Sequence, residues 1–226
     1  MVVLVHGLGV GQRYFEPLAR ELSASDRAKP GRAEQAGLGP GLLRPEFREP
    51  APIAELGTRL GELLDAPAAL VANSMGCQIA TALAVQRPDL VSSLALIGPT
   101  VDSQTHSLVR HVFRLAADVW FEPFRLTAIV ISDYATFGPL ALLRQARYAL
   151  DDRIEERLPL LDVPAVVVRG VHDPLCPPRF GQEVAALLPH GRLVTIGGAG
   201  HAPHFSHPRE VAEAIRALPG IPAARG

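Results

Sequence analysis

The chain has 226 residues, enough for one domain with a sizeable buried core and an inserted segment. Charged residues make up 20% of it and apolar residues 48%, a composition that excludes the disordered and fibrous classes. The formal net charge is -1 and the basic residues are scattered singly, which argues against a nucleic-acid footprint or a polybasic membrane contact. We therefore expect a compact α/β protein that has neither nucleic acid nor a membrane as its partner.

The cysteines and the first residues bear on the compartment. Cys77 and Cys176 are too few for a disulfide scaffold. The apolar run Met1–Val5 lacks the basic leader and the length of a signal peptide or a membrane span. These features predict a cytoplasmic protein with free thiols.

The same run, Met1–Val5, is typical of a strand inside a parallel sheet with both faces covered. A glycine-rich turn follows it, and apolar residues then recur at helical spacing from Tyr14 to Leu22. The glycines miss the spacing of a dinucleotide-binding loop, and no strand with a terminal acid follows about 20 residues later. The turn is better suited to place the backbone N–H of Leu8 at a developing oxyanion, with His6 bracing the loop.

The next region carries few regular patterns. From Ser23 to Pro52 the chain is rich in Gly, Pro and Arg, and only Arg32–Gly41 offers a candidate, a poor one, for an edge strand. We expect this region to be mostly irregular. Helical spacing of apolar residues returns over Ile53–Leu64, and Pro67 closes that helix.

The stretch around Ser74 organises the sequence. An apolar strand beginning near Leu70 ends at Ser74, and a helical pattern starts at Cys77. Strand, serine and helix meet without room for a loop, which forces the serine into a strained conformation and lifts its hydroxyl clear of the sheet. Small residues stand two positions before and after it, Ala72 and Gly76. This pattern indicates a nucleophile elbow, and the alternative is an ordinary serine at a helix N-cap.

A long insertion follows the next strand, Val91–Ile97. The interval before the strand Ala165–Arg169 is several times longer than the dozen or so residues that a crossover needs. Three segments of this interval place apolar residues at helical spacing. We therefore predict a helical cap of residues 102–158, inserted into a core of residues 1–101 and 159–226. Aromatic residues at the segment junctions are expected to line the substrate pocket: Trp120, Phe121, Phe124, Tyr134 and Phe137.

Polar residues directly follow the last two strands. Ala165–Arg169 leads to Asp173, and Leu193–Ile196 leads to His201. Together with Ser74 they give three polar groups, each just past the carboxyl end of a strand, where open parallel sheets bind ligands. The order Ser, Asp, His along the chain is that of a hydrolase triad.

These residue types suit nucleophilic catalysis because a serine hydroxyl needs a nearby base whose tautomer is fixed. His201 would accept the proton of Ser74, and Asp173 would orient the imidazole. The backbone N–H groups of Leu8 and Met75 would form an oxyanion hole.

Two alternatives concern the acid and a metal. Asp102, just past the preceding strand, is an alternative acid. His201, His204 and His207 recur every three residues, but no carboxylate or cysteine accompanies them as metal ligands. We predict no metal and no cofactor.

With these stretches in place, the chain resembles the α/β-hydrolase fold family, most closely its esterase and carbon–carbon bond (meta-cleavage product type) hydrolase branch. The resemblance covers nearly the whole chain and rests on four stretches: His6–Gly9, Ala72–Gly76, Gly170–Pro174 and Gly200–His201. It implies a mostly parallel sheet flanked by helices, with a helical cap inserted between strands.

The chain also departs from the family pattern. Ala72 stands where glycine is commoner, and the two strands that usually precede the His-Gly strand are absent. We therefore expect a sheet reduced at its N-terminal edge to about five or six strands. An incomplete edge leaves open a homo-oligomer in which a partner covers it.

The resemblance implies a serine hydrolase that cleaves an ester of a small or medium apolar acyl substrate through an acyl-enzyme or oxyanion intermediate. Cleavage of a carbon–carbon bond in a vinylogous diketone uses the same residues and stays open. Two further alternatives are a non-catalytic ligand-binding protein on the same fold and a truncated chain with little activity.

Overall fold

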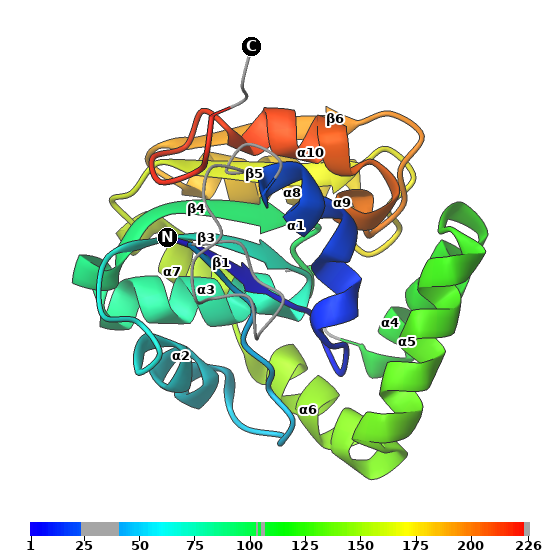
Figure 1. Cartoon of the computed structure of the whole chain (residues 1–226). Helices are drawn as coiled ribbons and strands as arrows, with labels where there is room; N and C mark the ends of the chain where they lie inside the picture. Colours follow the sequence, from blue (N-terminus) through cyan, green and yellow to red (C-terminus); the bar gives the residue numbers. More distant parts are fainter. Residues whose placement is uncertain (24–40, 103, 105–106, 224–226) are drawn as a thin grey trace.

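The computed structural model describes residues 1–23, 41–102, 104 and 107–223. Six strands form one sheet in the order β2-β1-β3-β4-β5-β6, and every pairing is parallel, so that their carboxyl ends share one edge (Figure 1). The strands are β1 Val2–Val5, β2 Leu42–Leu43, β3 Ala68–Asn73, β4 Val91–Ile97, β5 Ala165–Gly170 and β6 Gly191–Ile196. The predicted α/β architecture with a mostly parallel sheet flanked by helices is confirmed.

Helices cover both faces of the sheet. Alternate residues of β1 enter different cores: Val3 and Val5 pack on one face, Val2 and Leu4 on the other, and all four are buried. The first face is covered by α2 Ile53–Gly61, α3 Met75–Gln86 and α8 Pro178–Leu187. The second face is covered by α1 Glu16–Ser23 and α10 Pro208–Ile215.

Four helices lie between β4 and β5 in the chain. Their bounds are α4 Leu108–Asp118, α5 Phe124–Phe137, α6 Pro139–Asp151 and α7 Ile154–Arg157. In Figure 1, α4 and α5 (green) stand beyond the arrowheads of the strands, over the edge where the carboxyl ends meet. We call α4, α5 and α6 the cap helices. The exact boundaries 102 and 158 stay a prediction.

Short helical turns complete the chain, and none of them interrupts the sheet. They are η1 Gln12–Phe15, η4 Pro88–Leu90, η5 Val119–Phe121, η6 Leu158–Leu160 and α9 Pro203–Ser206. The turn η5 follows α4 directly, and α9 follows the loop after β6.

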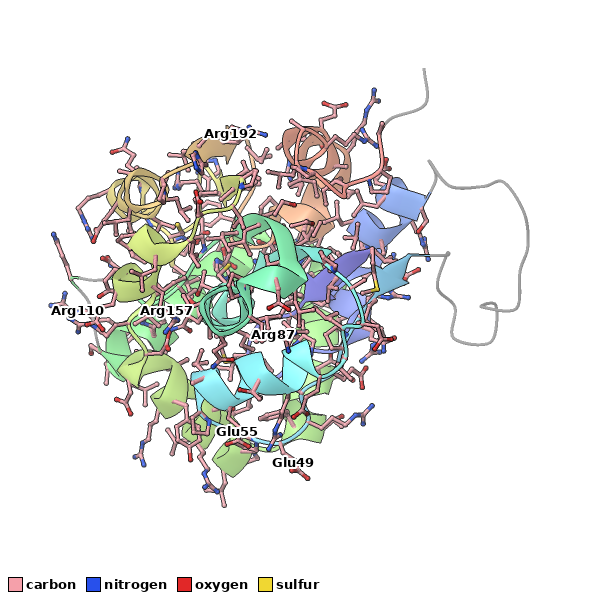
Figure 2. All side chains as sticks on the ribbon, turned by 90° about the vertical axis from the view of Figure 1, so that its left-hand side faces the viewer. Glu49, Glu55, Arg87, Arg110, Arg157 and Arg192 are labelled. Atoms are coloured by element: carbon pink, nitrogen blue, oxygen red, sulfur yellow. The ribbon has the colours of Figure 1, made fainter. Side chains whose placement is uncertain are left out.

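Polar contacts join α6 and α7 to the core. The Gln145 side chain accepts from the backbone N–H of Ala51 (2.8 Å), and the Gln78 amide donates to the carbonyl of Ala149 (2.8 Å). Arg157, labelled in Figure 2, pairs with Asp152 at 2.6 Å and donates to the carbonyl of Gln78 at 3.3 Å. The insertion is therefore fixed to the elbow helix α3 by directed hydrogen bonds.

The remaining sequence predictions concern minor elements and a membrane span. The candidate edge strand Arg32–Gly41 lies almost wholly outside the described residues, among which the strand at this edge of the sheet is the two-residue β2. Helix α8 was not predicted. Among the described helices none is by itself long and apolar enough to cross a membrane, and α5 and α6 reach that length and composition only together, across a 100° bend.

Candidate active site

Ser74 sits at the sharp junction of β3 and α3. Its backbone has φ 57° and ψ -128°, a region that residues with a side chain rarely adopt. A Cβ on Gly76 would lie 2.8 Å from the carbonyl oxygen of His6 and closer still to that of Val5, so glycine lets α3 approach β1. A Cβ on Gly7 would lie 3.1 Å from the Cβ of Ser74. The elbow therefore holds the serine against the loop that follows β1.

His201 and Asp173 form a buried pair. The His201 Nδ1 lies 3.0 Å from Oδ2 and 3.1 Å from Oδ1 of Asp173. Asp173 Oδ1 also accepts from the backbone N–H groups of Leu175 (2.8 Å) and Cys176 (2.9 Å). Burial by itself would raise the pKa of Asp173, but His201 and these two donors outweigh it and lower that pKa below its ordinary value. Asp173 is thus suited to remain an anion beside the imidazole.

The imidazole of His201 is surrounded by carboxylates. Burial by itself would lower its pKa, but Asp173 above all, and then Asp118 and Glu122, raise the pKa of His201 to about 9. The arrangement stabilises the imidazolium that forms when a base takes a proton from a serine.

The structure brings Ser74 to the same cavity as His201, without a direct hydrogen bond between them. Both side chains line a cavity of about 440 Å³. The His201 Nε2 is buried and has no hydrogen-bond partner among the described residues. Nucleophile–base hydrogen bonds are often long in unliganded enzymes and tighten with substrate. The three predicted triad residues therefore lie at one site, and Ser74 and His201 are not hydrogen-bonded to each other in this unliganded structure.

The predicted oxyanion hole lies in the wall of this cavity. Leu8 and Met75 both line it, and Met75 begins α3, so its N–H is one of the unpaired donors of a helix N-terminus. His6 braces the loop before Leu8: its Nδ1 lies 2.8 Å from the carbonyl oxygen of Gly7, and its Nε2 accepts from the N–H of Phe47 at 3.4 Å. Burial lowers the pKa of His6, which suits a neutral, structural imidazole.

The rest of the cavity wall is mainly apolar and comes from the cap. Val101, which follows β4, lines it and also has a positive φ of 64°. Apolar side chains of α4 and α5 complete this part of the wall, among them Leu108, Leu115, Leu126, Val130 and Ile131. Among the described lining residues no Arg or Lys is present, and the titratable ones include the acids Asp118 and Glu122 and the histidines His111 and His201.

The five aromatic residues predicted to line the pocket are mostly elsewhere. Tyr134 lines the cavity, whereas Phe137 lines a second cavity of about 190 Å³ near His6. Trp120 and Phe124 are 89% and 86% exposed, and Phe121 stacks on His172 with ring centroids 4.9 Å apart. These four side chains do not line the cavity that holds Ser74 and His201, although Asp118 and Glu122 from the same junction as Trp120 and Phe121 do.

Asp118 and Glu122 are site residues that the sequence analysis missed. Asp118 ends α4 and Glu122 follows η5, and both carboxylates accept hydrogen bonds from the backbone of the His201 loop. An acid on an amphipathic helix normally faces solvent, so the sequence offered only one weak indication: both acids lie near the end of the cap's longest apolar stripe.

The other candidates have different surroundings. Asp102 pairs with Arg114 (3.4 Å) and with Arg179, and no hydrogen bond to His201 is present among the described residues. His204 is buried between the rings of Tyr14 and Phe15, and burial lowers its pKa to about 3. These contacts make Asp102 a tie between α4 and α8, and His204 a neutral packing residue.

His207 and the two cysteines are the remaining candidate residues. The His207 Nδ1 lies 3.0 Å from the hydroxyl oxygen of Ser206. His201 and His204 each contact other residues. Cys77 and Cys176 are buried free thiols, and burial raises the pKa of both. Such thiols are poor nucleophiles.

Comparison with known proteins agrees with this architecture. Residues 2–214 match the family described as the alpha/beta hydrolase family. The chain is 29% identical over 243 aligned positions to the pimeloyl-[acyl-carrier protein] methyl ester esterase of Neisseria meningitidis serogroup B, covering 96% of this chain and 90% of that protein. Two solved structures share the fold. E-2-(acetamidomethylene)succinate hydrolase has a TM-score of 0.71, 18% identity and coverage of 96% and 90%. The enol-lactonase of Burkholderia xenovorans LB400 has a TM-score of 0.64, 20% identity and coverage of 95% and 90%.

Proposed function

The chain belongs to the alpha/beta hydrolase family, and from that premise we propose that it is a serine esterase in which Ser74, His201 and Asp173 act together. The observation that carries the proposal is the buried His201–Asp173 pair, 3.0 Å apart, whose His201 lines the same cavity as the strained Ser74. A relative that covers nearly the whole chain is named as a methyl ester esterase, which supports the same class of reaction.

The reaction follows from the groups present. The Ser74 hydroxyl oxygen attacks the ester carbonyl carbon while its proton moves to Nε2 of His201, and Asp173 stabilises the resulting imidazolium. The N–H groups of Leu8 and Met75 receive the oxyanion. The imidazolium then gives its proton to the departing alkoxide, and an acyl-enzyme remains on Ser74. Water, deprotonated by His201, releases the acid and restores the serine.

The cavity favours an uncharged acyl chain of medium length. Its wall is mainly apolar, and among the described lining residues there is no Arg or Lys that could pair with an anionic acyl end. A methyl ester at the end of an apolar chain, the kind of group named for the relative in Neisseria meningitidis, fits these properties.

The test is a set of p-nitrophenyl esters of increasing chain length together with the methyl ester of a medium-chain acid. We expect kcat/KM to be highest for medium apolar chains, and Ser74→Ala to lower kcat by at least about 10⁴-fold with the fold retained. Ser132→Ala, at an exposed cap serine, is the matched control and should behave as wild type. Wild-type turnover in Ser74→Ala, or faster cleavage of a vinylogous diketone than of every ester, would contradict the proposal.

A further inference from the structure

One short segment of the cap touches both loops that carry the proposed acid and base. It runs from Asp118, the last residue of α4, through η5 to Glu122. The backbone N–H of His201 donates to Asp118 Oδ1 (2.9 Å), and the backbone N–H of Ala202 donates to Glu122 Oε1 (2.7 Å). Between these two acids, Phe121 stacks on His172, the residue before Asp173, at an interplanar angle of 11°. The loops after β5 and β6 are thus held by the same turn.

The fit around Gly200 shows how close this contact is. A Cβ at Gly200 would lie 2.7 Å from Oε1 of Glu122, 2.8 Å from Oδ1 of Asp118 and 3.1 Å from Cβ of Phe121. A side chain at this position would force both carboxylates to move from their places against the loop. Glycine next to His201 therefore lets two carboxylates reach consecutive backbone N–H groups.

Burying these two carboxylates costs free energy that neutral side chains making the same contacts would not cost. Asp118 is 5% exposed, and Oε2 of Glu122 is buried without a hydrogen-bond partner among the described residues. Burial is the first cause that raises the pKa of each, and the pKa of Glu122 reaches about 7. A neutral Asn or Gln would accept the same backbone hydrogen bonds without that cost. The charges have a use if they act on the imidazole next to them.

We propose that Asp118 and Glu122 are positioning residues that fix the backbone of the His201 loop from the cap and act through their charge on the imidazole of His201. The proposal rests on the proposed serine esterase function. It assigns the two acids a place in the same site without contact to the reacting atoms.

The first test separates position from pocket shape by using p-nitrophenyl acetate, whose acyl group is too small to fill the cavity. Asp118→Ala and Glu122→Ala remove the acceptors and should lower kcat by roughly 10- to 100-fold with KM nearly unchanged. Asp118→Asn and Glu122→Gln keep an acceptor oxygen and should recover most of kcat at high pH. Glu156→Ala, at an exposed acid of α7, is the control and should match wild type.

The second test uses the pH profile, which a merely structural role would not shift. The groups that act on His201 are Asp173 from the loop after β5, Asp118 from α4, Glu122 after η5, and the neutral His204 from α9. Removing one negative charge lowers the pKa of His201, because the imidazolium loses a favourable partner. The acid limb of kcat/KM should therefore move to lower pH in Asp118→Asn and Glu122→Gln but not in Glu156→Gln.

The possible outcomes distinguish the positioning role of Asp118 and Glu122 from the serine esterase function on which it rests. If Ser74→Ala keeps wild-type turnover, the esterase mechanism itself fails. If turnover depends on Ser74 while both alanine variants retain wild-type kcat, the positioning role is overturned. An unshifted acid limb in the folded Asn and Gln variants would overturn the tuning role, and this readout decides the matter even if the alanine variants do not fold.

Discussion

The sheet and the cap helices use apolar residues in opposite ways. In the sheet, Leu70 and Val167 are fully buried, as are most of their neighbours in β3 and β5. In the cap, Trp120 and Phe124 are almost fully exposed, while the polar Asp118 and Gln145 are buried. Both regions have apolar sequences, yet only the first buries its apolar residues consistently.

The difference shows what fixes each region in place. The sheet is held by many small apolar contacts in a close-packed core, so an atom added where no space exists collides with its neighbours. The cap is held by a few directed hydrogen bonds, those of Gln78 and Gln145 on one side and of Asp118 and Glu122 on the other. We therefore expect backbone clearance to dominate stability in the core, and single polar groups to dominate in the cap.

The largest expected effect on stability is in the core. Gly76→Ala would place a Cβ against the carbonyl oxygens of Val5 and His6, and should lower the free energy of unfolding by about 3 kcal/mol or more. Gly197→Ala is the matched control, because no atom lies within 4 Å of the place its methyl group would take and its φ is not positive. Urea unfolding of both variants measures the difference. Equal stability of the two variants would contradict the expectation that backbone clearance dominates stability in the core.

The next largest effect on stability is expected at Gln145, a buried side chain that joins helix α6 to the core. Gln145→Leu keeps the volume but leaves the backbone N–H of Ala51 without its acceptor, which should cost about 1–3 kcal/mol. The exposed Gln104→Leu should change stability by less than about 0.5 kcal/mol. Thermal unfolding monitored by circular dichroism compares them. If Gln145→Leu is as stable as wild type, the hydrogen bond does not hold the cap.

A third effect is the dependence of stability on pH. Burial raises the pKa of Glu122 from 4.5 to about 7, so the folded protein binds this proton more tightly than the unfolded chain and loses stability as pH rises through that window. Glu122→Gln cannot ionise. Its Tm should therefore exceed that of wild type by several degrees at pH 8, and the gap should close at pH 4.5. A gap that is the same at both pH values would contradict the assigned proton affinity.

The smallest effect is expected at the exposed aromatics of the cap. Trp120→Ser and Phe124→Ser should each change the free energy of unfolding by no more than about 0.5 kcal/mol and leave kcat/KM unchanged, because neither side chain lines the cavity. Tyr134→Ser, at the aromatic that does line it, is the contrast and should raise KM for medium-chain esters. A large loss of stability or of kcat/KM in Trp120→Ser would show that the Trp120 side chain makes contacts in the working protein.

The same comparison explains which parts of the fold were predictable. β1, β3, β4 and β5 follow continuous apolar runs, and the loops after them bring Ser74 and Asp173 to one edge by topology alone. The unpredicted helix α8 does carry a pattern that could have been found, with Phe180, Val184 and Leu187 at spacings of four and three. The two-residue β2 has no pattern to find.

The helices of the cap could be predicted from the sequence, but which of their side chains are exposed could not. Its spacing gave α4, α5 and α6, yet the positions of Trp120 and Phe124 depend on how those helices pack on the core. The contacts of Asp118 and Glu122 with the His201 loop join residues about 80 positions apart, and no local pattern specifies them. Long-range packing of this kind is what the sequence alone did not reveal.

The most direct measurement of the central claim is labelling with a fluorophosphonate, which reacts with a serine only when a base and an oxyanion hole activate it. Intact-protein mass spectrometry should show one adduct, peptide mapping should locate it at Ser74, and His201→Ala should suppress it while the fold is retained. Folded wild-type protein that stays unlabelled, or carries the adduct at another serine, would contradict the claim that Ser74, His201 and Asp173 form a working catalytic site.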